Sequence, residues 1–168
     1  MVRKALFLDR DGTINVDTGY LYKIEDFRLI PGIVELCRAA VAKGYEIVVI
    51  TNQSGIGRGM YTEQQFLELT EFMKSLFRSH GVEILDVFFC PSVDDSHEDR
   101  KPNPGLFLKA HDTYGFDMAV SASLGDKERD VLAGIRAGVG SNFLFSSSTE
   151  PTQATARVSD LKDLFELL

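Results

Sequence analysis

The chain has 168 residues, of which 44% are hydrophobic and 26% charged, and its formal net charge is −7. This composition predicts one globular domain over residues 1–168 and argues against nucleic acid or an anionic membrane surface as a partner. No apolar run reaches the length of a membrane span, and two cysteines provide no disulfide framework. We therefore expect a cytoplasmic protein, and we expect it to be a monomer.

The first predicted element is a strand that ends in two carboxylates. Residues 5–8 are continuously apolar, as in a strand buried on both faces of a parallel sheet. Asp9 and Asp11 follow it, so both can face one pocket while Arg10 points elsewhere. Like charges this close repel unless a cation, a shared proton or a phosphate-handling role accounts for them. Magnesium is the simplest cation for such an all-oxygen site, and a solvated turn is the alternative.

A flap, a helix and a second strand are predicted next. Residues 14–30 form a long irregular segment, which we interpret as a substrate-facing flap because it leaves directly from the paired acids. The helix is opened by Pro31 and Gly32 and closed by Gly44. Residues 45–50 are then a buried strand. One helix face carries its apolar residues Ile33, Leu36, Ala40 and Val41.

The turn that follows the second strand is Thr51–Gly55. A threonine hydroxyl beside free backbone N–H groups is suited to hold phosphate oxygens, although an ordinary loop uses the same residue types. Thr62 and Gln65 form a predicted capping box for a long amphipathic helix that ends at His80 and Gly81.

Residues 84–90 are the third predicted strand, followed by a polar loop over 91–99. Asn103 is expected to cap the next helix, with Pro104 as its first residue. Lys101 then stands just before a helix N-terminus, a position that favours anions. A solvated basic pair with Arg100 is the plain alternative.

The last third of the chain contains two further predicted strands, over 119–124 and 142–145. Asp126 is expected to cap the helix between them, which runs to Ala137 and is closed by Gly138. A terminal helix is predicted to start at Ser159. It is expected to pack through Leu161, Leu164 and Phe165.

The alternation of strands and helices predicts an α/β fold with a doubly wound, Rossmann-like, mainly parallel sheet in a three-layer sandwich. The chemical clusters then share the carboxyl edge of the sheet, where ligands bind in such folds. The clusters are Asp9 with Asp11, Thr51, Lys101, and Asp126 with Asp130. Together they suit phosphoryl transfer to a carboxylate.

In these motifs the chain resembles the haloacid dehalogenase superfamily of aspartate-nucleophile phosphatases, with DRDGT, a strand-end threonine, a lysine and GDKERD. The resemblance implies that Asp9 attacks phosphorus and that Asp11 acts as acid and then base. It implies a Mg²⁺ site made by Asp9, the backbone carbonyl of Asp11, and Asp126. Thr51 and Lys101 would neutralise the transferring oxygens, and Asp130 would orient Lys101 or a metal-bound water.

A closer resemblance is to the D-glycero-D-manno-heptose 1,7-bisphosphate 7-phosphatases, through FLDRDGTINVDTGYLYKIEDF, TNQSGIGRGMYTEQQF, RKPNPG and GDKERD. It implies a sugar-bisphosphate substrate from lipopolysaccharide precursor synthesis. The segment lengths leave no room for a separate cap domain. The substrate-binding residues that the resemblance implies are Asp17, Thr18, Gly19, Tyr20, Thr51, Asn52, Gln53, Ser54, Arg58, Arg100, Lys101 and Lys127.

The chain departs from this family in the loop before RKPNPG. Members usually carry a zinc loop there with three cysteines and one histidine. Here Cys90 remains, Ser92 replaces the expected histidine, and His97 and Asp99 stand nearest the motif in a shortened loop. Because structural zinc requires four suitable ligands, we expect none.

Three alternatives remain open. Histidinol-phosphate phosphatases share the capless form, although TNQSGIGRG and GDK favour the heptose enzymes. A signalling receiver domain would need its acceptor aspartate after the third strand, where this chain has Cys90 and Pro91. A non-catalytic phospho-ligand binder is disfavoured because none of the four motifs is broken.

Overall fold

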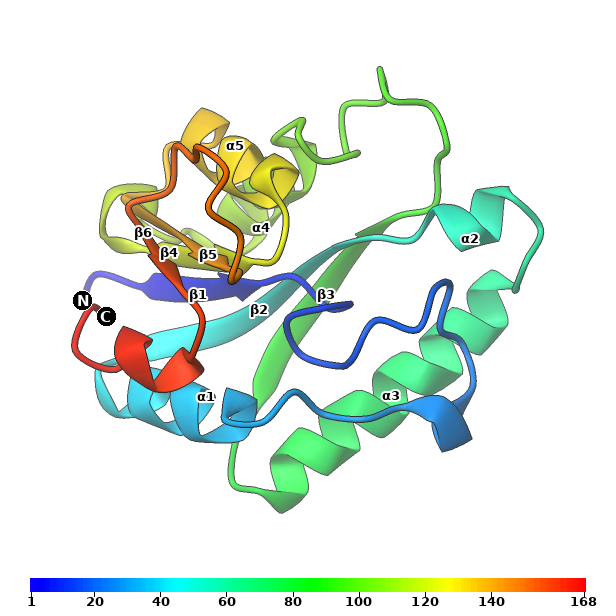
Figure 1. Cartoon of the computed structure of the whole chain (residues 1–168), viewed down its shortest axis with the longest axis horizontal. Coiled ribbons are helices and arrows are strands. Elements are labelled where there is room, and N and C mark those ends of the chain that lie inside the picture. The colour runs from blue at the N-terminus through cyan, green and yellow to red at the C-terminus, as the bar shows by residue number, and fades with distance from the viewer.

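A six-stranded parallel sheet forms the middle layer of the protein (Figure 1). The computed structural model describes all residues, 1–168. The strand order is β3-β2-β1-β4-β5-β6, and every neighbouring pair is parallel. The strands are β1 (Lys4–Leu8), β2 (Tyr45–Asn52), β3 (Ile84–Cys90), β4 (Ala122–Gly125), β5 (Ser141–Phe145) and β6 (Ala156–Val158).

Helices cover both faces of this sheet, so the predicted three-layer, doubly wound α/β fold is confirmed (Figure 1). One core cluster joins the sheet to α1, α3 and η3, and a second joins its other face to α4 and α5. The helices are α1 (Ile33–Ala42), α2 (Ser54–Gly57), α3 (Glu63–Ser79), α4 (Gly105–Tyr114) and α5 (Glu128–Arg136), with 3-10 turns η1 (Ile24–Asp26), η2 (Met118–Val120) and η3 (Leu161–Leu164).

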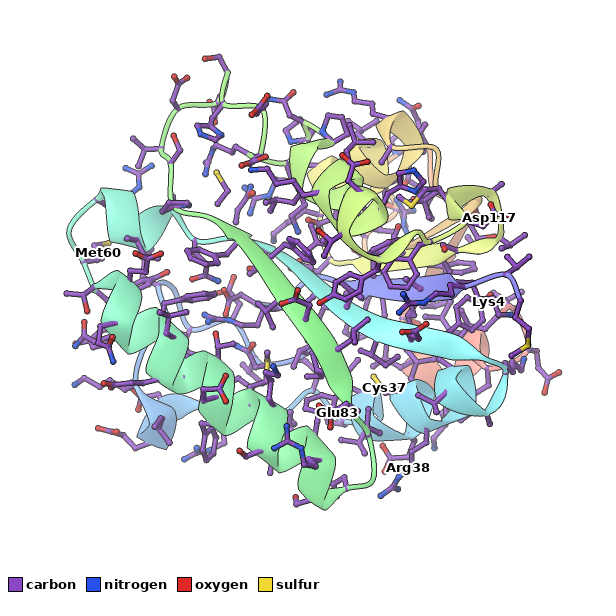
Figure 2. The ribbon with its side chains drawn as sticks, turned by 180° about the vertical axis from the view of Figure 1, so that it is seen from behind. Lys4, Cys37, Arg38, Met60, Glu83 and Asp117 are labelled. Atoms are coloured by element: carbon purple, nitrogen blue, oxygen red, sulfur yellow. The ribbon has the colours of Figure 1, made fainter.

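The predicted boundaries of α1 and α3 hold, but the buried face of α1 differs from the prediction. Thr62 caps α3 through the expected capping box with Gln65. Figure 2 shows Cys37 facing the sheet, and this thiol is fully buried. Val41 is instead 45% exposed. The apolar stripe at a helical period is completed by Cys37 and Ala40, which leaves Val41 at its solvent edge.

Two helix starts were predicted wrongly. Helix α4 begins after Pro104, because the side chain of Asn103 donates to loop carbonyls instead of capping the helix. Helix α5 has Lys127 at its N-cap position, and the Asp130 carboxylate accepts a hydrogen bond from the Lys127 backbone N–H. Asp126 therefore does not cap the helix, and its carboxylate is available for other contacts.

The fourth strand and the C-terminal segment also differ from the predictions. Residues 118–120 form a 3-10 turn, so β4 starts only at Ala122. Residues 156–158 form the unpredicted edge strand β6, and the expected terminal helix is the short 3-10 turn η3. No helix is both long enough and apolar enough to cross a membrane.

Candidate functional site

The site lies where the strand order reverses, between β1 and β4 at the carboxyl edge of the sheet. The backbone N–H of Asp9 donates to the Leu124 carbonyl at 3.0 Å, which aligns the end of β1 with the end of β4. Ligand oxygens of Asp9, Asp126 and Asp130 consequently lie within 4.8 Å of one another. Two segments far apart in the sequence thus supply one carboxylate cluster.

The end of β2 brings in the lysine. The Asn52 side chain accepts a 3.0 Å hydrogen bond from the Lys101 backbone N–H and donates a 3.1 Å bond to the Lys101 carbonyl. These two bonds fix the backbone of a loop residue to the sheet. Lys101 can therefore extend its side chain beneath the carboxylates from a defined starting point.

The ammonium group of Lys101 is buried and has three oxygen partners. Its Nζ lies 2.9 Å from Asp9 Oδ1, 2.8 Å from Asp130 Oδ1 and 2.7 Å from the Ile50 carbonyl. An ammonium group has three N–H donors, so all three are engaged. In this arrangement the positive charge of Lys101 acts on a ligand through Asp9, and Asp130 holds the lysine in place.

The charges in this cluster shift one another's pKa values. Burial, followed by the neighbouring Asp130 carboxylate, raises the pKa of Asp9 well above its ordinary value, although Lys101 opposes this. Burial and Asp130 also raise the pKa of Asp126. Burial lowers the pKa of Lys101, but Asp130 and Asp9 outweigh that effect and raise it overall. The cluster therefore carries more negative charge than Lys101 alone offsets.

These residues fit a magnesium ion. Asp126 Oδ1 is buried without a hydrogen-bond partner, and the Asp11 carbonyl accepts none of the backbone hydrogen bonds. Gly12, at φ 86°, leaves the Asp126 carboxylate its space, since a Cβ there would lie 2.2 Å from Asp126 Oδ2. Carboxylate and carbonyl oxygens are the ligands that Mg²⁺ prefers. Asp130 is less suited, because its two oxygens already contact Lys101 and the Lys127 N–H.

Mg²⁺ is expected to raise the melting temperature of the metal-free protein. At 100 times its dissociation constant, a ligand that binds only the folded state stabilises it by about 2.7 kcal/mol, which corresponds to roughly 5–10 °C for a domain of this size. Asp126→Asn should remove most of this shift, whereas the exposed Asp112→Asn on α4 should retain it. The raised pKa values of Asp9 and Asp126 favour their protonated forms at acid pH, and protonated carboxyl groups bind Mg²⁺ poorly. The increase in melting temperature caused by Mg²⁺ should therefore grow from pH 5 to pH 8. An undiminished shift in Asp126→Asn, measured by differential scanning fluorimetry, would place Mg²⁺ elsewhere.

Asp11 is held by donors from three directions. Asn15 Nδ2 donates to Asp11 Oδ1 at 3.0 Å, and Gln53 Nε2 donates to Asp11 Oδ2 at 3.1 Å. The Arg10 guanidinium is almost fully buried and lies 3.0 Å from Asp11 Oδ1. The prediction that Arg10 points elsewhere was therefore wrong, because the long side chain folds back onto the acid. Arg10 also lies over the Phe66 ring, 5.7 Å from its centroid.

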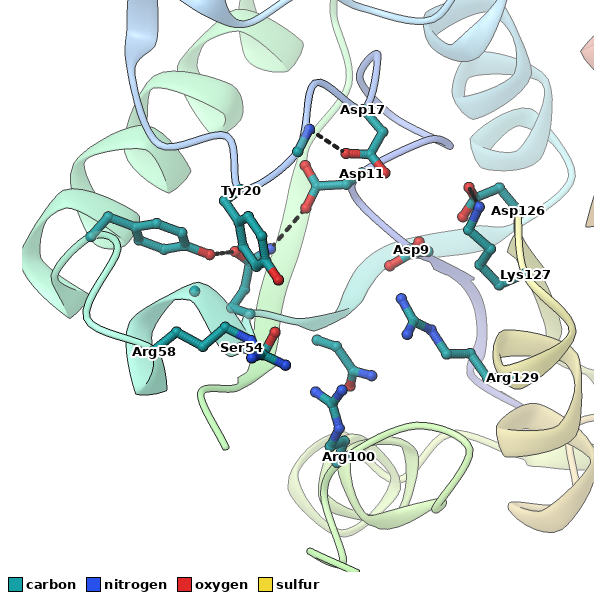
Figure 3. A pocket seen from close by; sticks show the side chains of 15 residues that line it. Asp9, Asp11, Asp17, Tyr20, Ser54, Arg58, Arg100, Asp126, Lys127 and Arg129 are labelled. Atoms are coloured by element: carbon teal, nitrogen blue, oxygen red, sulfur yellow. Dashed lines mark hydrogen bonds and ion pairs between the residues drawn. The ribbon is translucent and has the colours of Figure 1, made fainter. Parts of the chain in front are cut away.

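Above these acids is a pocket of about 360 Å³ whose wall carries both signs of charge (Figure 3). Arg100 is fixed by a 2.9 Å ion pair with Asp95 and a 3.1 Å bond to the Ser92 carbonyl. Figure 3 shows Arg129 beside Asp9, on the opposite wall from Arg58. The lining residues are Asp9, Asp11, Asp17, Gly19, Tyr20, Asn52, Gln53, Ser54, Gly55, Arg58, Tyr61, Arg100, Asp126, Lys127 and Arg129.

The lining contains most, but not all, of the predicted substrate residues. Thr18 lines a neighbouring hollow instead. Thr51 and Lys101 lie beneath the pocket and are nearly inaccessible. Tyr61 and Arg129 were not among the predicted residues, although the latter lies within the GDKERD motif. The position of Arg129, three residues after Asp126 and in the first turn of α5, was the available signal.

In the loop before Lys101, the candidate zinc ligands Cys90, His97 and Asp99 contact one another or other protein groups. His97 Nδ1 accepts a 3.1 Å hydrogen bond from the Asp99 N–H and lies 3.9 Å from Cys90 Sγ. The Asp99 carboxylate forms an ion pair with Lys109. The prediction of no zinc in this loop stays a prediction.

Comparisons with known proteins agree with this geometry. Residues 4–131 match the family model described as polynucleotide kinase 3 phosphatase, and residues 99–164 match a HAD-hydrolase-like family. A D-glycero-α-D-manno-heptose-1,7-bisphosphate 7-phosphatase of Burkholderia mallei is 43% identical, over 100% of this chain and 95% of the relative. A D-glycero-β-D-manno-heptose-1,7-bisphosphate 7-phosphatase of Yersinia pestis is 41% identical, over 93% of this chain and 87% of the relative.

One solved structure shares the fold closely. It is the D,D-heptose 1,7-bisphosphate phosphatase of B. bronchiseptica complexed with magnesium and phosphate. Its TM-score is 0.85 at 27% sequence identity, and the match covers 98% of this chain and 97% of that one.

Proposed function

Because the chain belongs to the haloacid dehalogenase-like hydrolases, and within them to the D-glycero-D-manno-heptose-1,7-bisphosphate 7-phosphatase family, we propose that it removes the 7-phosphate of this heptose bisphosphate. As a member of this family the protein is a phosphoric monoester hydrolase. The observation that carries the proposal is the pocket itself, which combines a partly buried aspartate at its floor, Asp9, with guanidinium groups on its walls.

In the proposed reaction the Asp9 carboxylate attacks phosphorus, and the bond to the sugar oxygen breaks. Asp11 donates a proton to that oxygen, which gives the alcohol and an aspartyl phosphate on Asp9. Asp11 then takes a proton from a water molecule as the water oxygen attacks phosphorus, which releases inorganic phosphate and restores Asp9. Lys101 fixes Asp9 Oδ1, and this leaves the other carboxylate oxygen for the attack.

The acidic cluster supports Mg²⁺ as the cofactor, held by Asp9, the Asp11 carbonyl and Asp126. When bound, the ion supplies positive charge that offsets the charge of the phosphoryl oxygens. We propose further that residues 1–168 act as one capless domain and as a cytoplasmic monomer. Asp17, Gly19 and Tyr20 of the flap, which line the pocket, and the loop before Lys101 would then select the substrate directly.

The second phosphate group of the substrate explains the cations of the pocket wall. Arg58 and Arg129 line the pocket without forming an ion pair or a side-chain hydrogen bond in the structure. Guanidinium groups form strong, charge-assisted bonds to phosphate oxygens. Figure 3 shows the Arg129 and Arg100 guanidinium groups on the same side of the acids, where both are suited to hold the phosphate that is not transferred.

Arg129→Ala is expected to raise KM for the bisphosphate about 10-fold, the effect of losing one charge-assisted hydrogen bond. KM for a sugar monophosphate, which lacks the second phosphate, should change less than about twofold. Arg38→Ala, on the outer side of α1, is the matched control and should change neither value (Figure 2). Steady-state kinetics with both substrates test this, and equal effects of Arg129→Ala on the two would contradict it.

The proposed function is tested by measuring phosphate release from a panel of substrates. The panel contains both anomers of the heptose bisphosphate, since the two relatives differ in this respect, together with histidinol phosphate and simple sugar phosphates. We expect the highest kcat/KM for one heptose bisphosphate anomer and dependence on Mg²⁺. Preference for histidinol phosphate, or turnover that survives Asp9→Asn, would refute the proposal.

A further inference from the structure

Asp11 is joined to Tyr61 by a chain of buried polar groups. The Tyr61 hydroxyl donates to Gln53 Oε1, and Gln53 Nε2 donates to Asp11 Oδ2 at 3.1 Å and to Thr51 Oγ1 at 2.9 Å. Gln53 and Tyr61 are 2% and 5% exposed. The chain thus runs from the loop before α3 to the pocket floor.

The partners of the Gln53 amide determine which way it faces. A carboxylate only accepts hydrogen bonds, so the amide must present its NH₂ group to Asp11 and its oxygen to Tyr61. Tyr61 must then donate its proton. Burial raises the pKa of the Tyr61 phenol to about 12, so the hydroxyl retains that proton at neutral pH. Without the hydroxyl, Gln53 Oε1 would be buried and unpaired, and only the two bonds from Nε2 to Asp11 and Thr51 would hold the amide.

The other donors to Asp11 do not replace this link. Asn15 and the Arg10 Nε bind Oδ1, which leaves Gln53 and one Arg10 nitrogen at Oδ2. The carboxylate plane is therefore fixed by a donor at each side, one from the segment after β1 and one from the end of β2. Loss of the Gln53 bond leaves Oδ2 with only the 3.2 Å bond from Arg10, so the group is held less firmly against turning about its side-chain bond.

We infer that Tyr61 is a positioning residue for the reaction: by orienting the Gln53 amide, it holds the Asp11 carboxyl group toward the leaving oxygen of the substrate. This inference rests on the proposed function, in which Asp11 protonates that oxygen. Tyr61 need not touch the substrate for this role. A displacement of about 1 Å at a reacting group can lower a rate by 10²-fold, so an indirect contact of this kind has a measurable effect.

The test compares Tyr61→Phe with Tyr22→Phe on two classes of phosphate ester. Tyr22 stacks against Tyr61, with ring centroids 5.6 Å apart, but its hydroxyl has no hydrogen-bond partner in the structure. Each variant removes one oxygen atom from the same aromatic stack. The heptose bisphosphate has a strongly basic alkoxide leaving group that needs a proton, whereas the weakly basic 4-nitrophenolate of 4-nitrophenyl phosphate leaves without one.

Tyr61→Phe is expected to lower kcat for the heptose bisphosphate about 10-fold and kcat for 4-nitrophenyl phosphate less than about threefold, while Tyr22→Phe resembles the wild type for both. In the Asp11→Asn background, Tyr61→Phe should cause no further loss, because its effect passes through Asp11. Equal losses on both esters, a change confined to KM, or a full additional loss in that background would overturn the inference.

The same series separates this inference from the proposed function. Asp11→Asn should itself lower kcat selectively for the alkyl ester, by about 10²–10⁴-fold. If Asp11→Asn lowers kcat equally for both esters, Asp11 is not the acid, and the proposed mechanism and the inference both fail. If Asp11→Asn is selective while Tyr61→Phe matches Tyr22→Phe, only the inference fails.

Discussion

Replacing Asp9 by asparagine is expected to lower kcat for the heptose bisphosphate by at least about 10⁴-fold, because the amide has the same shape but is no nucleophile. The same substitution should stabilise the metal-free protein at neutral pH. Asp9 is buried beside Asp130 and Asp126, and its pKa is raised well above the ordinary value. Asparagine removes a charge that the folded cluster disfavours and can still accept the hydrogen bond from Lys101.

The pH dependence follows from the direction of this shift. A carboxyl group whose pKa is raised by folding stabilises the protein below its unfolded pKa of about 3.9, and this stabilisation is lost as the pH rises through the folded pKa. The advantage of Asp9→Asn should therefore widen from pH 4 towards neutrality. Urea unfolding without metal measures it, and Asp112→Asn is the control. An Asp9→Asn protein that is less stable than the wild type at pH 7 would contradict this account of the cluster.

The second large effect is expected for Lys101→Met. Removing one partner from a buried ion pair typically costs about 3–5 kcal/mol, because it leaves an uncompensated charge. Here two carboxylates, of Asp9 and Asp130, lose the same cation. For a domain of this size the melting temperature should fall by roughly 10 °C. Activity should fall about 10²–10³-fold with the loss of electrostatic stabilisation near the phosphoryl group.

The loss of stability in Lys101→Met should be greatest at neutral pH and smaller near pH 4, where the Asp9 carboxyl group, whose pKa is raised, is protonated and uncharged. Lys109→Met is the matched control. Its ion pair with Asp99 involves a half-exposed lysine and should contribute at most about 1 kcal/mol. Urea unfolding of both variants at pH 4 and pH 7 measures this difference. A loss in Lys101→Met that does not change with pH would show that packing, rather than charge, is responsible.

The sequence was sufficient to predict the sheet and the position of the site because both follow from local patterns. Continuous apolar runs at residues 5–8 and 45–50 indicate strands buried on both faces. In a parallel sheet the residues after each strand meet at one edge, so Asp9 and Asp126 could be placed together without coordinates. Lys101 could be placed at the same edge because its motif, RKPNPG, follows the strand predicted over residues 84–90.

The first residues of helices α4 and α5 could not be predicted from local patterns. Asn103 and Asp126 are both good capping residues, but neither caps a helix in this fold. Asn103 donates to the carbonyls of Asp95 and His97, and the N-terminus of α5 is satisfied by Asp130 from within the helix. Propensity describes an isolated segment, and tertiary contacts decide between such options.

The contacts around Asp11 were the least predictable part of the site. Tyr61 lies fifty positions along the chain from Asp11 and reaches it only through Gln53. The contact of Arg10 with Asp11 depends on the path of a long side chain, which strand geometry does not specify. Strand β6 has only three residues, too few for its alternation of apolar and charged side chains to predict a strand, and its pairing with β5 identifies it.

The position of β1 in the sheet also constrains how the protein is made. This strand is synthesised before both strands that it pairs with, and its register is completed on one side by Val49 in β2 and on the other by Leu124 in β4. Such non-local pairing forms slowly, since the intervening polypeptide must first be brought together. A ribosome-bound nascent chain therefore carries Asp9 long before it carries Asp126, and catalytic competence appears only after β4 and Asp126 have been translated.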